Sequence, residues 1–372
     1  MLKKIMRFFF RIIFSRDFII NKGFSKNAVV SYLPEVFRIK SKRYYFSHQN
    51  REENLIIVST LVSLGYNVRI IRFNKAINNI SEKIDLVIGL EPNFELLCHT
   101  FPKAIKIYYA TGSYYSFQNI MIESRTNSFN KKYGFSISEN RKVSEHLSSE
   151  LADYILQVGN HHTMKTYPKE VQSKIHLIKQ ACHNFEGPLQ NEKKDRNRFL
   201  WLGSSGSLLK GLDILLEVFS SRADVCLDIV GTIDSDFYEL YAKKIIMNSK
   251  NIEFHGFLDI WGKKFKHIYE CCSYSIFPSF SEGYPGSVVN TMKLGLLPIV
   301  SSVAAEPFII ENGIVLDTIS ENSIRKAIDL AIHIDNEEYE IKTSQICMIS
   351  REKYSVLNYS KNIKDLLSKM VK

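Results

Sequence analysis

The sequence predicts an α/β protein with two domains, each built on a largely parallel sheet. Three observations support this prediction. The chain has 372 residues, which is too long for one ordinary hydrophobic core and suits two domains of roughly 150–190 residues. Short runs of β-branched and other apolar residues alternate with helical patterns in both halves. These runs lack strict polar–apolar alternation, as is typical of parallel strands covered on both faces.

Predicted strands of the first half lie at 27–33, 67–73, 84–90, 105–110, 154–159 and 175–179. Those of the second half lie at 198–203, 225–231, 251–256, 273–278 and 297–302. Helices are predicted at 52–64, from 212 onward, around 237–248, near 262–271 and after 287. The first helix should end at Gly65, because glycine readily adopts the left-handed conformation that closes a helix. This alternation predicts parallel sheets flanked by helices.

The domain boundary is predicted within residues 186–198, where the sequence EGPLQNEKKDRNR is polar and charged and contains both Gly and Pro. This linker separates an N-terminal domain, 1–185, from a C-terminal domain, 199–350. Residues 351–372 form a final segment. Its helix, roughly 358–371, is a candidate for crossing back onto the N-terminal domain.

Positive charge is concentrated at the N-terminus. The net charge is +10, and residues 1–45 hold eleven Lys and Arg against two acidic residues. In the arm 1–14, one helical face is apolar: Ile5, Phe8, Phe9, Ile12 and Ile13. The opposite face is basic: Lys4, Arg7 and Arg11. This pattern favours a helix lying on an anionic membrane surface, and the alternative is a first helix packed on its own domain. No nucleic-acid-binding motif accompanies the charge, so nucleic acid is not an expected partner.

The sequence also favours a reducing compartment. The six cysteines show no CxxC spacing, which indicates structural thiols rather than disulfides or a metal site. No apolar run approaches the roughly 20 residues of a membrane span. Arg11 interrupts the apolar region that a secretory signal would need. We therefore expect a cytoplasmic protein, at the inner face of the membrane if the arm binds lipid.

The segment from Phe277 to Ser302 carries the most chemical information. A strand ends at Phe277, a turn rich in Pro, Ser and Gly follows, and a helix is predicted to start with Ser287 as its cap. The start of a helix presents free N–H groups and a positive dipole end, which suit a phosphate. Glu282, just outside that end, could accept hydrogen bonds from sugar hydroxyls.

A second segment, from Phe199 to Phe219, has a strand, then Gly203-Ser-Ser-Gly206, then Lys210-Gly211 and an amphipathic helix. Glycines let backbone amides approach a phosphate, and Lys210 can add a positive charge. A plain tight turn is the alternative. The segment is neither a Walker A loop nor the GxGxxG of dinucleotide-binding proteins, which disfavours an NAD-dependent oxidoreductase.

In their order, the motifs of the second half resemble glycosyltransferase family 4, of the GT-B fold. They are Gly203, Lys210-Gly211, Val230-Gly231, Phe254-His-Gly256, Pro278-Ser-Phe-Ser-Glu282-Gly283 and Gly295-Leu-Leu-Pro298. The first half matches more loosely, as in a bacterial subgroup of the family, through Ser47-His48-Gln49-Asn50, Tyr109-Ala110-Thr111-Gly112-Ser113, Phe117-Gln118-Asn119 and Gly159-Asn160. The resemblance implies two Rossmann-like domains whose parallel sheets face a central cleft.

The resemblance also implies roles for individual residues. Lys210 and Glu282 would be catalytic. The donor would be bound by Gly203, Ser204, Ser205, Gly206, Gly231, Gly256, Phe257, Gly283, Tyr284, Gly286, Ser287 and Asn290. The acceptor side would contain His48, Thr111, Gly112, Ser113, Asn119, Asn160 and His162. Each acceptor-side residue has a structural alternative; His48, for example, could cap the following helix.

Two positions depart from the family pattern. Family members usually carry Arg directly after the first glycine, where this chain has Ser204, and a second Glu where it has Asn290. The resemblance implies a retaining transfer from a nucleotide sugar to a surface polysaccharide or lipid-linked acceptor, with no metal or other cofactor. The departures leave a catalytically degenerate protein that binds sugar or nucleotide as the alternative.

Overall fold

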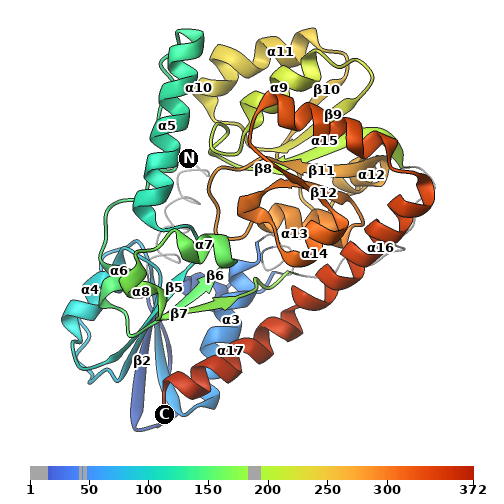
Figure 1. Cartoon of the computed structure of the whole chain (residues 1–372). Helices are drawn as coiled ribbons and strands as arrows, with labels where there is room; N and C mark the ends of the chain where they lie inside the picture. Colours follow the sequence, from blue (N-terminus) through green and yellow to red (C-terminus); the bar gives the residue numbers. More distant parts are fainter. Residues whose placement is uncertain (1–15, 42–43, 45–47, 183–193) are drawn as a thin grey trace, which may run out of the picture. The chain divides into compact units, whose positions relative to one another are not determined.

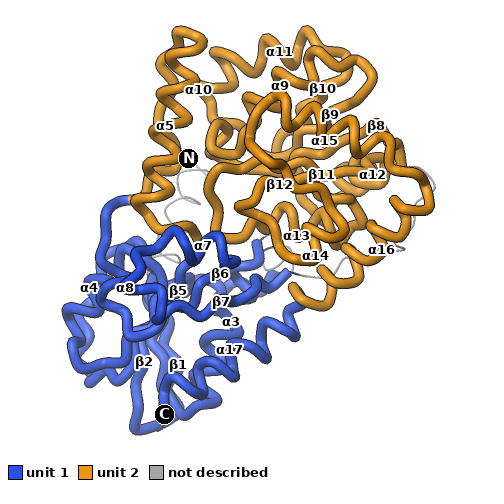
Figure 2. Tube along the Cα trace, viewed as in Figure 1, with its two compact units in different colours: residues 1–111, 144–183, 355–372 blue, residues 112–143, 184–354 orange. Residues whose placement is uncertain are grey.

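The computed structural model describes residues 16–41, 44, 48–182 and 194–372. The chain forms two compact units (Figure 2). Unit 1 comprises residues 1–111, 144–183 and 355–372, and unit 2 comprises residues 112–143 and 184–354. The basic arm 1–14 lies outside the described residues, as does most of the predicted linker 186–198. None of the described helices is long and apolar enough to cross a membrane.

Unit 1 is built on a seven-stranded sheet with the strand order β1-β3-β2-β4-β5-β6-β7 (Figure 1). Its strands are β1 Phe18–Ile20, β2 Lys26–Tyr32, β3 Tyr66–Arg72, β4 Leu86–Gly89, β5 Ile105–Ala110, β6 Tyr154–Val158 and β7 Ile175–Ile178. All neighbours pair in parallel except β1, which runs antiparallel to β3. The six predicted strands of the first half are confirmed, and only the short edge strand β1 was not predicted.

The helices of unit 1 are η1 Pro34–Phe37, α3 Asn50–Ser63, α4 Asn93–Thr100, α6 Ser148–Leu151, α7 His161–Lys165, α8 Lys169–Gln172 and α17 Val356–Met370. The predicted helix 52–64 is confirmed as α3, and Gly65 after it is left-handed with φ 85°. The final helix α17 packs against α3 in the same unit. The C-terminal segment from residue 355 therefore belongs with the N-terminal sheet.

Unit 2 contains a fully parallel six-stranded sheet in the order β10-β9-β8-β11-β12-β13. Its strands are β8 Asp195–Gly203, β9 Cys226–Gly231, β10 Ile252–Gly256, β11 Cys272–Phe277, β12 Leu297–Ser301 and β13 Ile314–Leu316. Both β11 and β12 are buried along their whole length, because helices cover both faces of a parallel sheet. The five predicted strands of this half are confirmed, and the three-residue β13 was not predicted.

The helices of unit 2 are α5 Tyr115–Tyr133, α9 Leu212–Ser220, α10 Ser235–Phe237, the π-helix η2 Tyr238–Ala242, α11 Lys243–Asn248, α12 Lys263–Cys271, α13 Gly286–Lys293, η3 Ser302–Ala304, α14 Pro307–Asn312, α15 Glu321–His333 and α16 Asn336–Lys353. All six cysteines are free.

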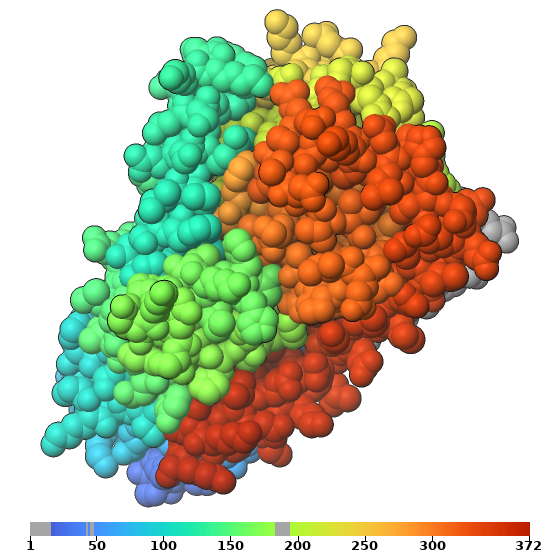
Figure 3. Space-filling model, viewed as in Figure 1, coloured from blue at the N-terminus to red at the C-terminus, as the bar shows by residue number. Residues whose placement is uncertain are grey.

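Helix α5 differs from the predicted domain boundaries, because it follows β5 of the first sheet but packs within unit 2 (Figures 2 and 3). Phe129 of α5 is buried against Phe237 and Tyr241, with ring centroids 5.6 and 4.9 Å apart. Burial of these rings gives α5 its apolar partner in unit 2.

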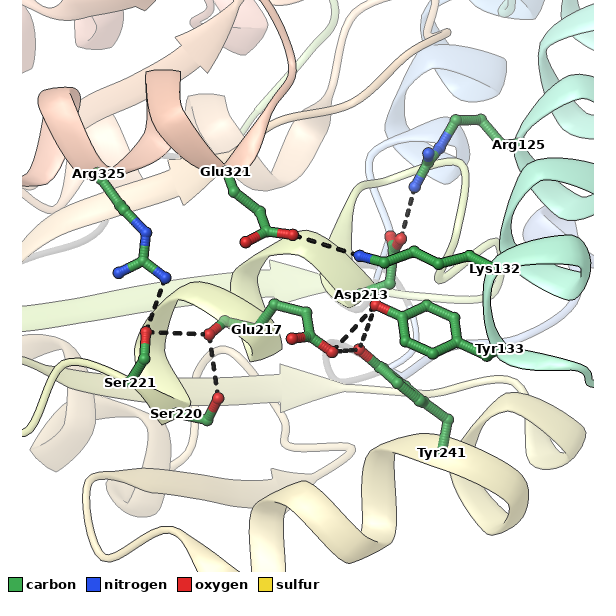
Figure 4. Close-up of polar contacts among 10 residues, drawn as sticks. All are labelled: Arg125, Lys132, Tyr133, Asp213, Glu217, Ser220, Ser221, Tyr241, Glu321 and Arg325. Atoms are coloured by element: carbon green, nitrogen blue, oxygen red, sulfur yellow. Dashed lines mark hydrogen bonds and ion pairs between the residues drawn. The ribbon is translucent and has the colours of Figure 1, made fainter.

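Polar contacts fix the position of α5 along this surface (Figure 4). Arg125 donates to Asp213 of α9 at 2.6 Å, and its guanidinium lies 4.4 Å from the ring centroid of Phe280. Further along the helix, Tyr133 donates to Glu217 at 3.0 Å. Contacts in the middle and at the C-terminal end of the helix therefore specify one register for the docking of α5.

A buried carboxylate joins three elements of unit 1. Glu53 of α3 is only 2% exposed. One of its oxygens accepts a hydrogen bond from the Ala181 N–H at 3.0 Å, and the other accepts from the Tyr109 hydroxyl of β5 at 2.9 Å. The Tyr109 hydroxyl in turn lies 3.0 Å from that of Tyr359 in α17. Burial raises the pKa of Glu53 to about 7, although these hydrogen bonds oppose the shift.

We expect the stability of unit 1 to fall as the pH rises from about 4.5 to above 7. In this window the unfolded chain releases the Glu53 proton while the folded unit retains it. The loss approaches about 3 kcal/mol. Glu53→Gln removes the titration, so its stability should change less across the window. Hydrogen exchange of the β2 amides at pH 5 and pH 8 measures the difference, and equal pH dependence in both proteins would contradict this assignment.

Candidate functional site

The strand order of unit 2 has a switch point beside β8. The chain proceeds outward from β8 through β9 to β10, and then returns to the other side of β8 with β11. Loops that follow neighbouring parallel strands diverge at such a switch point, where open α/β sheets bind their ligands. The loops after β8, β9 and β11 carry the residues that the sequence singled out.

The loop after β8 surrounds a buried ammonium group. Lys210 is 5% exposed. Its Nζ donates to the Ser204 carbonyl at 3.2 Å, the Ser204 hydroxyl at 3.0 Å and the Ser205 carbonyl at 3.1 Å. Burial lowers the pKa of Lys210 to about 8, an effect that the Glu282 carboxylate opposes. Among the described residues, the oxygens that accept hydrogen bonds from this cation are neutral, so its charge is available to an anionic ligand.

Asp234, in the loop after β9, binds the backbone of the same glycine-rich loop. Its carboxylate accepts from the Ser205 hydroxyl at 2.7 Å, the Gly206 N–H at 2.9 Å and the Ser207 N–H at 2.7 Å. The Gly206 amide, predicted to face a donor phosphate, therefore donates to a carboxylate of the chain. Sequence reasoning missed Asp234, although its position three residues after the strand end at Gly231 was a usable signal.

Glu282 lies in the loop between β11 and α13, which is held against the Lys210 loop. The Phe280 N–H donates to the Leu209 carbonyl at 2.9 Å. Gly211 is left-handed with φ 67°, and a Cβ there would lie 2.5 Å from the Pro278 carbonyl oxygen. Ser279 donates to the Glu282 carboxylate at 3.4 Å. The two predicted catalytic residues are thus brought together, close enough to influence each other electrostatically.

The start of α13 differs from the prediction. Pro285 is the residue before the helix, which begins at Gly286, and no side chain caps it. The prediction that Ser287 caps the helix is therefore wrong. Pro285 has φ −74° and ψ 110°, outside the helical region, so the helix starts directly after it and Ser287 falls inside the first turn.

Several other predicted donor residues have packing roles in unit 2. Gly203 and Gly231 face each other on β8 and β9, and a Cβ at Gly231 would lie 1.7 Å from the Gly203 oxygen. Tyr284 is buried and stacks on Tyr354 at 5.3 Å, while Gly283 is also buried. The half-buried members on β10 and α13 are Gly256, Gly286, Ser287 and Asn290. Phe257, after β10, is 75% exposed.

The predicted acceptor-side residues are divided between the units. In unit 2, Gly112 is half-buried, Ser113 donates to the Glu282 carbonyl at 2.8 Å, and Asn119 bonds the Val143 backbone at 2.8 and 2.9 Å. In unit 1, Thr111 is exposed and His162 is half-buried.

Two further members of that set make local hydrogen bonds in unit 1. The exposed His48 accepts from the Asn50 N–H at 3.3 Å. The N-cap of α3 is Gln49 and no side chain caps this helix, so the alternative of His48 as its cap is not confirmed. Asn160 forms a reciprocal capping box with Thr163 at the start of α7, and capping accounts for this residue type without a ligand.

Asp228, Glu253 and His255 lie close enough together for their oxygen and nitrogen atoms to bind a metal ion. Asp228 is fully buried, but its carboxylate already accepts from Arg198 at 2.6 and 2.9 Å. Its Oδ1 also lies 2.7 Å from His255 Nε2. The group is therefore an ion-pair network linking β8, β9 and β10.

Comparisons with known proteins agree with this arrangement. Residues 196–333 match the family Glycosyl transferases group 1, and this range contains the loops of Lys210, Asp234 and Glu282. No curated protein sequence matches the chain.

Among solved structures, HepE of Anabaena in complex with UDP and glucose is 13% identical, with TM-score 0.58, 92% of this chain covered and 99% of that chain. A glycosyltransferase of Rickettsia africae is 14% identical, with TM-score 0.62 and 94% and 100% covered. WaaG, a glycosyltransferase involved in lipopolysaccharide biosynthesis, is 14% identical, with TM-score 0.55 and 91% and 98% covered.

The two parallel-sheet units and these likenesses define the fold as GT-B. Within it, residues 196–333 match the glycosyl transferases group 1 family.

Asp234→Ala should lower the free energy of unfolding by about 1–3 kcal/mol, because it leaves the Gly206 and Ser207 amides without their acceptor. Asp234→Asn keeps one acceptor oxygen and should recover part of the loss. Urea denaturation of the three proteins measures the effect, and equal stability of Asp234→Ala and the wild type would show that the carboxylate does not hold the loop.

Proposed function

We propose that this enzyme transfers a sugar, with retention of anomeric configuration, from a nucleotide sugar to a surface polysaccharide or lipid-linked acceptor. The observation that carries the proposal is that Lys210 and Glu282 lie close enough at the switch point of unit 2 for the Glu282 carboxylate to act on the charge of Lys210. HepE, which shares the fold, was solved with UDP and glucose, and this favours a nucleotide-sugar donor for the present chain.

The proposed mechanism depends on the charge that develops when the nucleoside diphosphate leaves. A buried ammonium group, held by oxygens before the reaction, stabilises that charge without reorganising. Lys210 provides such a group. Its free-enzyme pKa of about 8 predicts that kcat/KM falls as the pH rises through that value, because the neutral amine cannot assist.

Glu282 would orient the donor sugar by accepting hydrogen bonds from its hydroxyls. The exposed ring of Phe257 is proposed to face the nucleotide base. The acceptor would be bound from unit 1, where Thr111 and His162 follow strands β5 and β6. The proposed reaction uses no cofactor or metal, since the nucleotide sugar is a substrate and Lys210 supplies the positive charge.

A second candidate is a GT-B protein that binds sugar or nucleotide without turnover. The specific observation in its favour is the pair of departures, Ser204 and Asn290, from the family pattern. Ser204 has its own role in the structure, as an acceptor for Lys210, which favours a loop adapted for binding.

Release of nucleoside diphosphate from UDP-, GDP-, ADP- and CMP-sugars, with membrane extract as acceptor, tests the two candidates. We expect turnover with one donor, a fall of about 10²–10³ in kcat for Lys210→Ala, and partial recovery in Lys210→Arg. Glu282→Gln, of the same shape, should also lose activity. Tight donor binding without turnover would support the binding protein, and near-wild-type kcat in Lys210→Ala would contradict the role of Lys210.

The acceptor and location are proposed on different grounds. WaaG acts in lipopolysaccharide biosynthesis, and the basic amphipathic arm of this chain would place its active site at the cytoplasmic face of the membrane. A growing glycan of the cell envelope is the acceptor that fits both the likeness to WaaG and the basic arm.

Deletion of residues 1–14 should abolish binding to liposomes that contain anionic lipid, because it removes four basic residues and the apolar face of the arm. Cosedimentation measures the binding, and donor turnover on a soluble acceptor serves as the control for folding. Unchanged cosedimentation of the truncated protein would refute the membrane anchor.

A further inference from the structure

The segment that follows α5 returns over unit 2 and is fixed at several points. Asn130 of α5 holds Ile137 through its N–H and carbonyl at 2.9 and 3.0 Å. The Ser138 N–H donates to Asp236 at 2.7 Å. Gln118 donates to the Arg141 carbonyl at 3.1 Å, and Asn119 makes its two bonds to Val143. Two neighbouring side chains of α5 therefore clamp the backbone on each side of residue 142.

The clamped segment holds Arg141 in a strained conformation. Its φ is 71°, the only positive φ of a non-glycine residue in the described part of the chain. The left-handed region is unfavourable for an arginine relative to ordinary backbone. Such strain persists only where the surroundings impose it, and it often marks a functional position.

This conformation directs the Arg141 side chain onto the glycine-rich loop. Its Cδ would lie 2.7 Å from a Cβ placed on Gly206, so the lack of a side chain at residue 206 makes room for it. Its Nη1 lies 3.4 Å from the Ser205 carbonyl oxygen, which also accepts from Lys210 at 3.1 Å. Two cations from distant parts of the sequence thus converge on one carbonyl oxygen.

Two positive charges held this close repel each other, and Arg141 accordingly favours the neutral form of Lys210, lowering its pKa. The carboxylates that oppose this effect are Glu282 and Asp234, and Asp234 is already engaged with the loop amides. Arg141 itself is exposed. A guanidinium and an ammonium beside one carbonyl oxygen match a ligand with several anionic oxygens, which arginine can bind through two parallel hydrogen bonds.

We propose that Arg141 is a donor-binding residue whose guanidinium, together with Lys210, binds the diphosphate of the nucleotide sugar. This inference rests on the proposed function and adds a residue to it. It also gives the chain a guanidinium beside the loop in which Ser204 replaces the arginine of the family pattern. Gln118 and Asn119 are then positioning residues, since they hold the backbone that presents Arg141.

Calorimetric titration with UDP, GDP, ADP and CDP, and with the matching unphosphorylated nucleoside, tests the proposal. For the diphosphate that the wild type binds, Arg141→Met should weaken binding about tenfold to hundredfold, because a charge-assisted hydrogen bond is lost. Affinity for the nucleoside should not change. Lys142→Met is the matched control, because Lys142 is adjacent, has the same charge and pairs with Glu139 at 2.5 Å. It should bind the diphosphate as the wild type does.

Arg141→Gly separates binding from folding. Glycine adopts the left-handed conformation without strain, so this variant should be at least as stable as the wild type and yet bind the diphosphate as weakly as Arg141→Met. Diphosphate affinity within twofold of the wild type in both variants, or an equal loss of nucleoside affinity, would overturn the inference and leave the proposed function intact. A wild type that binds none of the four diphosphates would overturn both.

Discussion

The docking of α5 on unit 2 is the interaction on which the arrangement of the candidate site depends. The helix follows β5 of the first sheet, and its Phe129 is buried against α10 and η2, which lie with it in unit 2. The Arg125–Asp213 ion pair fixes the register of α5 more than it stabilises the fold. Burial disfavours the charged form of the Asp213 carboxylate and raises its pKa, although Arg125 opposes this shift. Ser113, just before α5, holds the backbone of Glu282, and the segment after α5 carries Arg141. One helix thus contributes to both sides of the proposed donor site.

The electrostatic design of the site follows from this docking. Lys210 is buried among neutral oxygens, with the Arg141 guanidinium beside it, and the Glu282 carboxylate favours its charged form. Such an arrangement favours negatively charged ligands, and the positive groups are already in place before a ligand binds. The Asp234 carboxylate already accepts hydrogen bonds from the Gly206 and Ser207 amides. The proposed anionic ligand would therefore be attracted by the side chains of Lys210 and Arg141 more than by these loop amides.

Much of this architecture could be predicted from the sequence. Parallel strands covered on both faces must be continuous apolar runs, so eleven strands could be located, and only β1 and β13, of three residues each, were too short to stand out. The nearness of Lys210 to Glu282 could be anticipated because both follow strands of one sheet. The cap at Ser287 was wrong because Pro285, two residues earlier, already sets the start of the helix.

The remaining features depend on tertiary packing. Helix α5 has no marked apolar face, and a local pattern does not say which unit will bury Phe129. Asp234 and Arg141 are ordinary polar residues in loops, and only their distances to Gly206 and Ser205 give them a role. The positions that the family pattern suggested for the acceptor, such as Asn119, turned out to contact backbone, a function that residue type alone does not distinguish from ligand binding.

The division of the chain between the units limits where this chain and a relative of the same fold can be joined in a chimera. The backbone passes from one unit to the other four times, near residues 111, 143, 183 and 354. A chimera joined only at the linker would therefore inherit α5, and Arg141 with it, from the parent of its N-terminal half, while the surface that receives α5 came from the parent of its C-terminal half. A recombinant keeps the contacts of α5 only if residues 112–143 travel with unit 2, so the unit of inheritance is discontinuous in sequence although it is compact in space.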